Sequence, residues 1–170
     1  MDVSLDAEAE NLSTFSRSRF IHDFITLSKS MNAPYSQTTI ENILIAFNEH
    51  WENSAILFRC TDRPGGVVNF CFFARRRVDM IAIAAHASLI KLEDPLAQMI
   101  TSWSSLGQGD SHQWCDFDPR KGLAKTWVYF SHVQPIDEIL SLSEMPASVR
   151  EFAPVLHSLG LEEVIFTAVD

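Results

Sequence analysis

The 170-residue sequence is poor in basic side chains and has no long hydrophobic run. It contains 13 Lys and Arg against 22 Asp and Glu, and the formal net charge of −9 argues against a nucleic-acid binder, which needs a basic surface to meet phosphates. The longest apolar run, Met80 to Ala85, is far shorter than the roughly 20 residues of a membrane-spanning helix. The acidic N-terminus lacks the apolar stretch of a secretory signal. Neither a membrane nor a nucleic acid is expected as a partner.

Cysteine is also scarce. The three cysteines, Cys60, Cys71 and Cys115, are odd in number and have no CxxC spacing, so neither a disulfide framework nor a cysteine-based zinc site is predicted. The six histidines show no ligand spacing, and no metal site is expected. Apolar residues make up 46% of the chain, with 12 Phe and 4 Trp, which is enough for a substantial core. We therefore expect a globular cytoplasmic protein.

The hydrophobic periodicity predicts pairs of helices alternating with pairs of strands after a flexible arm at residues 1–14. Pro154 is expected to kink the last helix, and residues 78–85 also fit a buried strand. The expected helices cover 15–31, 40–51, 78–90, 95–106, 136–143 and 147–158. The expected strands cover 54–61, 67–74, 112–117, 124–130 and 164–169.

The strand pairs recur along the chain. Strands that open a pair begin near Ser54, Ser111 and Leu161, a period of roughly 50–57 residues that is typical of a repeated structural unit. The third unit stops after its first strand, 164–169, which would leave an open sheet edge. We therefore expect the sequence to be incomplete.

Alternation along the strand 124–130 places Lys125, Trp127 and Tyr129 on one face. A cation beside two aromatic rings suits an anionic ligand such as a diphosphate together with a flat substrate or a developing carbocation. The alternative is that Lys125 is an exposed residue on a half-covered sheet and that the aromatic residues are ordinary strand formers.

The first pair of strands shows similarly mixed faces. Leu57 shares a face with Arg59, and Asn69 shares a face with Cys71. If the sheet curls with its helices outside, these faces line a common interior in which Arg59 provides a second cation.

Asp116 and Asp118 are candidates for a pair of metal ligands. They precede the turn Asp118-Pro119-Arg120-Lys121-Gly122. Carboxylates at such a position commonly cap the turn, and we predict that role for both.

The stretches 114–130 and 143–170 contain a Lys-Thr-aromatic strand, a Met-Pro helix start and a Gly-Leu turn into the next strand. In these features the chain resembles the soluble ABBA-type aromatic prenyltransferases of actinobacteria and fungi, from about residue 15 to its C-terminus. The resemblance implies an α+β fold, an antiparallel β-barrel of helix-helix-strand-strand units with outer helices, of which residues 15–170 would form the N-terminal part.

The resemblance also implies an activity. A family member transfers a prenyl group from dimethylallyl or geranyl diphosphate to an electron-rich phenolic or phenazine-like acceptor, so small-molecule substrates and a monomeric full-length protein are expected. The alternative is a non-catalytic truncated α/β module that self-associates or binds a small ligand.

Site residues follow from the resemblance by position, without a catalytic residue among them. Lys125 matches a lysine that grips the diphosphate, and Arg59 is expected to add positive charge. Asn69 stands where magnesium-dependent members keep an aspartate, so Mg²⁺ is not expected as a cofactor. The remaining residues expected to line the barrel interior are Trp127, Tyr129, Leu57, Cys71, Ile165 and Thr167.

Overall fold

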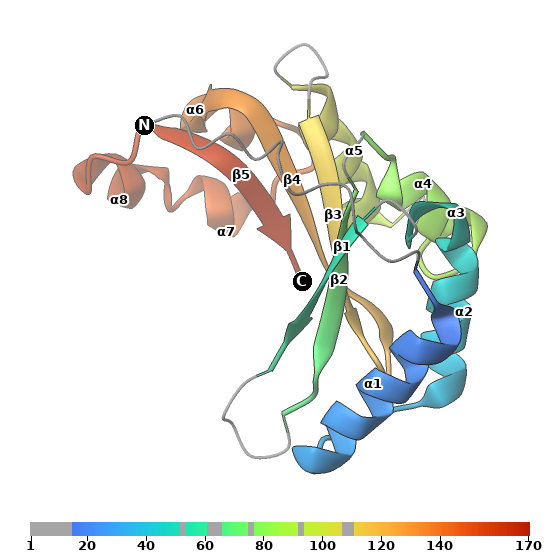
Figure 1. Ribbon diagram of the computed structural model, residues 1–170. Coiled ribbons are helices and arrows are strands. Elements are labelled where there is room, and N and C mark those ends of the chain that lie inside the picture. Colours follow the sequence, from blue (N-terminus) through green and yellow to red (C-terminus); the bar gives the residue numbers. More distant parts are fainter. Residues whose placement is uncertain (1–14, 52–53, 61–65, 75–76, 92–93, 107–110) are drawn as a thin grey trace, which may run out of the picture.

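The computed structural model describes residues 15–51, 54–60, 66–74, 77–91, 94–106 and 111–170. The arm expected at 1–14 and most of the turn expected between the first two strands lie outside this part of the chain. The described residues form one antiparallel sheet and a set of helices (Figure 1). The α+β class is confirmed, and the five strands form an open sheet that is not closed into a barrel.

The strands follow one another across the sheet in the order of the sequence, and every neighbouring pair is antiparallel. Each of the expected strands is present. They are β1 (Ser54–Arg59), β2 (Asn69–Ala74), β3 (Ser111–Asp118), β4 (Gly122–Pro135) and β5 (Glu163–Val169).

The helices occur where the periodicity predicts them, although two of the expected helices are divided. They are α1 (Arg17–Ser30), α2 (Gln37–Ala46), α3 (Asn48–Trp51), α4 (Met80–His86), α5 (Pro95–Ser105), α6 (Ile136–Leu140), α7 (Ala147–Arg150) and α8 (Ala153–Ser158). Among the described residues no helix is long and apolar enough to cross a membrane.

The expected helix 147–158 is broken between α7 and α8. Pro154 lies in the first turn of α8, where its missing N–H costs nothing because the first amides of a helix have no intrahelical acceptor. The proline therefore starts a new helix instead of kinking a continuous one.

The ambiguous run at 78–85 is helical. The side chain of Asp79 accepts a hydrogen bond from the amide of Ala82 at 3.0 Å and so caps the start of α4. Met80, Ile81 and Ala84 are then buried on one face, as the 3.6-residue period requires.

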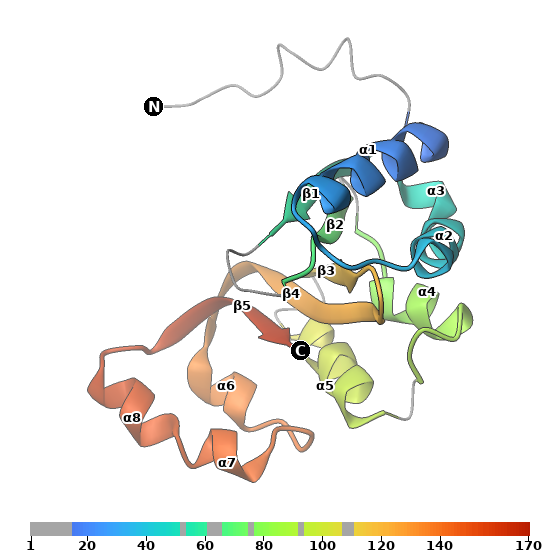
Figure 2. The same cartoon turned by 90° about the horizontal axis from the view of Figure 1, so that it is seen from below.

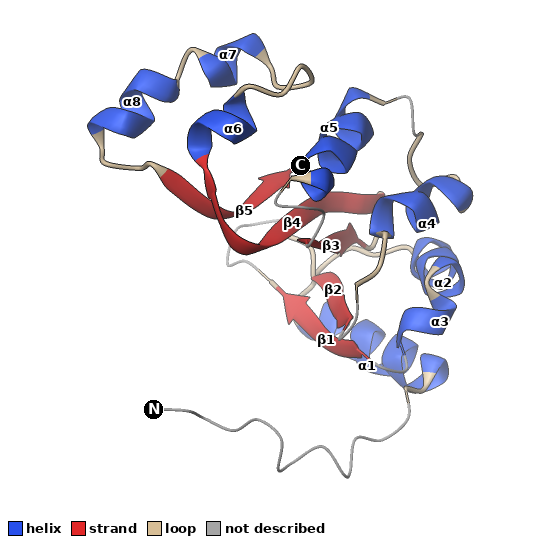
Figure 3. Cartoon of the chain, turned by 90° about the horizontal axis from the view of Figure 1, so that it is seen from above, coloured by secondary structure: helices blue, strands red, loops and turns tan. Residues whose placement is uncertain are grey.

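The sheet is curved, and the helices lie along its convex side (Figures 2 and 3). On this side Phe70, Phe72 and Phe117 pack against residues of α1, α2 and α3, and Val128 packs against residues of α5 and α6. One face of every strand is thus committed to the hydrophobic core, and the alternate residues are left for the concave face.

Candidate functional site

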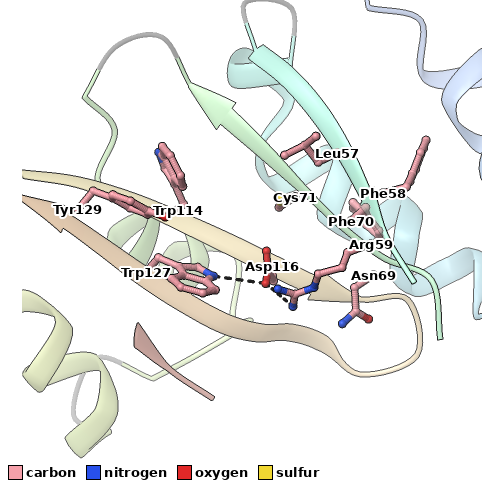
Figure 4. Close-up of a pocket in the computed structure, with 10 residues that line it drawn as sticks. All are labelled: Leu57, Phe58, Arg59, Asn69, Phe70, Cys71, Trp114, Asp116, Trp127 and Tyr129. Carbon is pink, nitrogen blue, oxygen red and sulfur yellow. Dashed lines mark hydrogen bonds and ion pairs between the residues drawn. The ribbon is translucent and has the colours of Figure 1, made fainter. Parts of the chain in front are cut away.

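The concave face of the sheet holds a cavity of about 280 Å³ (Figure 4). Its lining comes from the first four strands and comprises Leu57, Phe58, Arg59, Asn69, Phe70, Cys71, Trp114, Asp116, Trp127 and Tyr129.

Strands β1 and β2 bring four predicted residues together at this cavity. In their antiparallel register Leu57 pairs with Cys71 and Arg59 pairs with Asn69. Directly opposed residues share a face of the sheet, so the two mixed faces expected from alternation form one surface. Leu57, Arg59, Asn69 and Cys71 thus line one cavity, and their contacts with a substrate remain a prediction.

Trp127 and Tyr129 also lie on the concave face, in an aromatic cluster. The ring of Tyr129 lies 4.1 Å from that of Trp114 on β3 and 5.2 Å from that of Phe166 on β5, between centroids. Phe166 lies 5.5 Å from Trp127. Trp114 and Phe166 were not predicted as site residues, although alternation puts Trp114 on the same face of β3 as Asp116.

Ile165 and Thr167 were expected to face the interior, and the structure places Thr167 differently. Thr167 pairs with Val128, which is fully buried under the helices, so this residue of β5 belongs to the convex side. Phe166 pairs with Tyr129 and reaches the concave face instead. Ile165 lies at the register irregularity between β4 and β5 and is 43% exposed, and its place on the barrel interior stays a prediction. The expected orientation was wrong for Thr167, because the register between β4 and β5 is not encoded in β5 alone.

Two cations lie on the concave face, and each has a carboxylate partner. An Nη2 nitrogen of Arg59 lies 2.5 Å from Oδ2 of Asp116. Nζ of Lys125 lies 2.8 Å from Oδ1 of Asp170 and 5.1 Å from the centroid of the Trp127 ring. Lys125 is therefore beside the aromatic cluster, and both cations can exchange a carboxylate for another anion.

Only one of the two acidic residues before the turn acts as a cap. The carboxylate of Asp118 accepts hydrogen bonds from the amides of Arg120 at 2.7 Å and Lys121 at 3.2 Å, as predicted. Asp116 instead projects into the cavity and accepts a hydrogen bond from the indole N–H of Trp127 at 3.3 Å. The capping prediction was wrong for Asp116 because alternation turns it away from the turn and toward the neighbouring strands.

The thiol of Cys71 contacts the same region. Burial, the nearby charge of Asp116 and a hydrogen bond to its carboxylate raise the pKa of Cys71 to about 12. The thiol therefore stays protonated at neutral pH and serves as part of the apolar wall, not as a nucleophile.

Comparison with known proteins shows the family of the chain. Residues 15–170 match the family model described as aromatic prenyltransferase Orf2. The chain is 42% identical over 160 residues to an aromatic prenyltransferase of Sclerotinia sclerotiorum, covering 93% of this chain and 52% of that protein. It is 39% identical over 168 residues to one of Botryotinia fuckeliana, covering 98% of this chain and 54% of that protein.

A bacterial relative is more distant. The 4-hydroxyphenylpyruvate 3-dimethylallyltransferase of Streptomyces niveus is 33% identical over 156 residues, covering 92% of this chain and 48% of that protein. The chain thus spans about half the length of the curated relatives it matches. Since the family match extends over nearly all of the described residues, the chain belongs to the aromatic prenyltransferase Orf2 family.

Proposed function

We propose that the protein takes part in prenyl transfer from dimethylallyl or geranyl diphosphate to an electron-rich aromatic acceptor. One observation supports this most directly: Arg59 lines the same concave cavity as the rings of Trp114, Trp127 and Tyr129, with Lys125 beside it. A prenyl diphosphate needs a cationic surface for its diphosphate and an adjoining apolar surface for its prenyl chain. A phenolic acceptor fits the aromatic cluster. The name of the Streptomyces niveus relative contains such a compound, 4-hydroxyphenylpyruvate.

The reaction needs positive charge where the leaving group departs. The C–O bond of the prenyl diphosphate breaks with both electrons going to the diphosphate, and an allylic cation remains. Arg59 and Lys125 stabilise the negative charge that develops on the diphosphate. A ring carbon of the acceptor then forms the new C–C bond, and the same carbon loses its proton to the solvent or to the diphosphate.

The aromatic rings have a second task. The π-faces of Trp127, Tyr129 and Phe166 stabilise an allylic cation that lies over them. They also keep water away from the cation, which water would otherwise convert to an alcohol. Together with Trp114, the cluster draws its rings from three neighbouring strands.

We expect no requirement for Mg²⁺. Asn69 brings no charge to the cavity, and the carboxylate of Asp116 is already paired with Arg59. Within the described ranges no three His, Cys, Asp or Glu side chains are grouped so as to hold a metal ion. A guanidinium next to the one carboxylate of the cavity lining repels a divalent cation, so this donor set does not fit a protein-bound Mg²⁺.

The fold proposal is that the curved sheet is part of a closed antiparallel barrel. Its support is the continuous strand order, the curvature with the described helices on the convex side (Figure 3), and the length of the relatives. A monomeric state and a cytoplasmic location remain predictions.

Isothermal titration of the 170-residue chain with geranyl diphosphate tests the proposal. We expect saturable binding that Lys125→Ala abolishes, since this variant removes a cation beside the aromatic cluster. Lys121→Ala is the matched control, because Lys121 is an exposed lysine in the turn that precedes the same strand. Equal binding by the wild type and Lys125→Ala contradicts the assigned role. Saturable binding without transfer to any phenolic acceptor favours the non-catalytic alternative.

A further inference from the structure

Asp116 is a buried carboxylate at the centre of the cavity, with 6% of its surface exposed. Its Oδ2 atom accepts from two different strands: from the guanidinium of Arg59 on β1 and from the indole N–H of Trp127 on β4 (Figure 4). In the strand register Asp116 lies opposite Cys71 on one side and opposite Lys125 on the other. The carboxylate therefore connects the cationic and aromatic parts of the site.

A buried carboxylate is stable only with charged or hydrogen-bonding partners. The contacts with Arg59 and Trp127, together with the hydrogen bond from the thiol of Cys71, supply them, and none of these belongs to a helix cap or a turn. Asp118, two residues away on the same strand, has the ordinary turn-capping role, so the turn does not require Asp116. The contacts of Asp116 therefore serve the cavity and not the turn.

We infer that Asp116 is a positioning residue that orients Arg59 toward the diphosphate and Trp127 toward the prenyl group. The inference deepens the proposed function and rests on it. The side chain of Arg59 is 50% exposed, and without an anchor it would sample many rotamers in solvent. Its guanidinium has five N–H donors, so a contact through Nη2 leaves others for an anion.

The effect on Trp127 is electronic as well as geometric. A hydrogen bond to a carboxylate fixes the plane of the indole ring and increases its π-electron density. A richer π-face binds a cation more strongly, and Lys125 already occupies such a position 5.1 Å from the ring centroid. Asp116 thereby prepares the ring for the positive charge that develops on the prenyl group.

The test compares Asp116→Asn with Asp118→Asn, a matched change of the neighbouring carboxylate on the same strand. The first readout needs no ligand: the indole N–H resonance of Trp127, assigned with Trp127→Phe in ¹⁵N-labelled protein. We expect slow hydrogen exchange at this N–H in the wild type and in Asp118→Asn, and fast exchange in Asp116→Asn. Equal exchange in all three proteins overturns the anchoring of Trp127.

The second readout is the affinity for geranyl diphosphate. We expect Asp116→Asn to weaken binding by about tenfold or more, because the guanidinium of Arg59 loses its charged hydrogen-bond partner. In an Arg59→Leu background the same substitution should have a much smaller effect, because the guanidinium that it positions is gone. Binding by Asp116→Asn that equals or exceeds that of the wild type overturns the inference, since the carboxylate then acts only as a competing anion.

The two readouts separate the inference from the proposed function. If the wild-type chain does not bind geranyl diphosphate while Asp116→Asn still releases the indole N–H, the anchoring of Trp127 stands and the proposed function fails for this chain. If the wild type binds and neither readout responds to Asp116→Asn, the proposed function stands and the inference fails.

Discussion

The rings of Trp51 and Phe72 lie 4.3 Å apart between centroids, at an interplanar angle of 55°. Trp51 ends α3 and Phe72 is in the middle of β2, so this contact joins the helical layer to the sheet directly behind the cavity. Both side chains are fully buried. Strand β2, which has Cys71 on its concave side, is therefore held in place by aromatic packing on its convex side.

Phe72→Ala should destabilise the fold by about 3–5 kcal/mol, because it removes a buried ring and leaves a cavity beside Trp51. Phe152→Ala is the matched control: Phe152 is 51% exposed, and the same substitution there should change the free energy of unfolding by about 0.5 kcal/mol or less. Urea unfolding followed by tryptophan fluorescence measures both values. Similar losses in the two variants would contradict the location of the core.

Removal of divalent metal by EDTA should leave the binding of geranyl diphosphate unchanged. Arg59 and Lys125 supply the positive charge, and Asn69 contributes none that a metal would need to balance. Titration in EDTA and in MgCl₂ gives the two dissociation constants. Binding that appears only with MgCl₂ would show that a metal supplies charge that the two cations do not.

Alkylation should distinguish the three cysteines. Cys60 is exposed, whereas Cys71 and Cys115 are buried. Burial, the largest cause in both cases, raises the pKa of Cys71 and of Cys115 to about 12, so their reactive thiolate forms are almost absent at neutral pH. Iodoacetamide at neutral pH, followed by peptide mass spectrometry, should modify Cys60 first. Modification of Cys71 at the same rate as Cys60 would mean that the cavity thiol is ionised or accessible.

His157 should make stability depend on pH. Its ring nitrogens lie 3.1 Å from a carboxylate oxygen of Asp137 and 2.9 Å from one of Glu162, and these contacts raise the pKa of His157 above its usual range. The folded state therefore favours the protonated ring. The stabilisation is fully present below the unfolded pKa of about 6.5 and is lost as the pH rises through the higher folded value.

Urea unfolding of the wild type and of His157→Gln checks this sign. We expect the difference in the free energy of unfolding between the two proteins to be larger at about pH 6 than at about pH 9. A difference that is equal at both values would mean that the protonation of His157 is not linked to folding.

Much of the local structure follows from the sequence. Period-2 alternation placed Lys125, Trp127 and Tyr129 on one face of β4, and hydrophobic periodicity located the strands and most of the helices. These features depend on residues close in sequence, so pattern and propensity are sufficient to find them.

The relations between strands required the tertiary structure. Alternation shows which residues of one strand share a face. It does not show which residues of the neighbouring strand lie opposite them or on which side of the sheet that face lies. The register of β5 brought Phe166, not Thr167, to the aromatic cluster. Likewise, Asp116 and Arg59 are 57 positions apart, and only the joint pairing of β2 with β1 and β3 brings their charges into contact. The sequence by itself determined the kind of side chains that meet on the concave face, and the long-range pairing decided their partners, because strand register is set by contacts between distant segments.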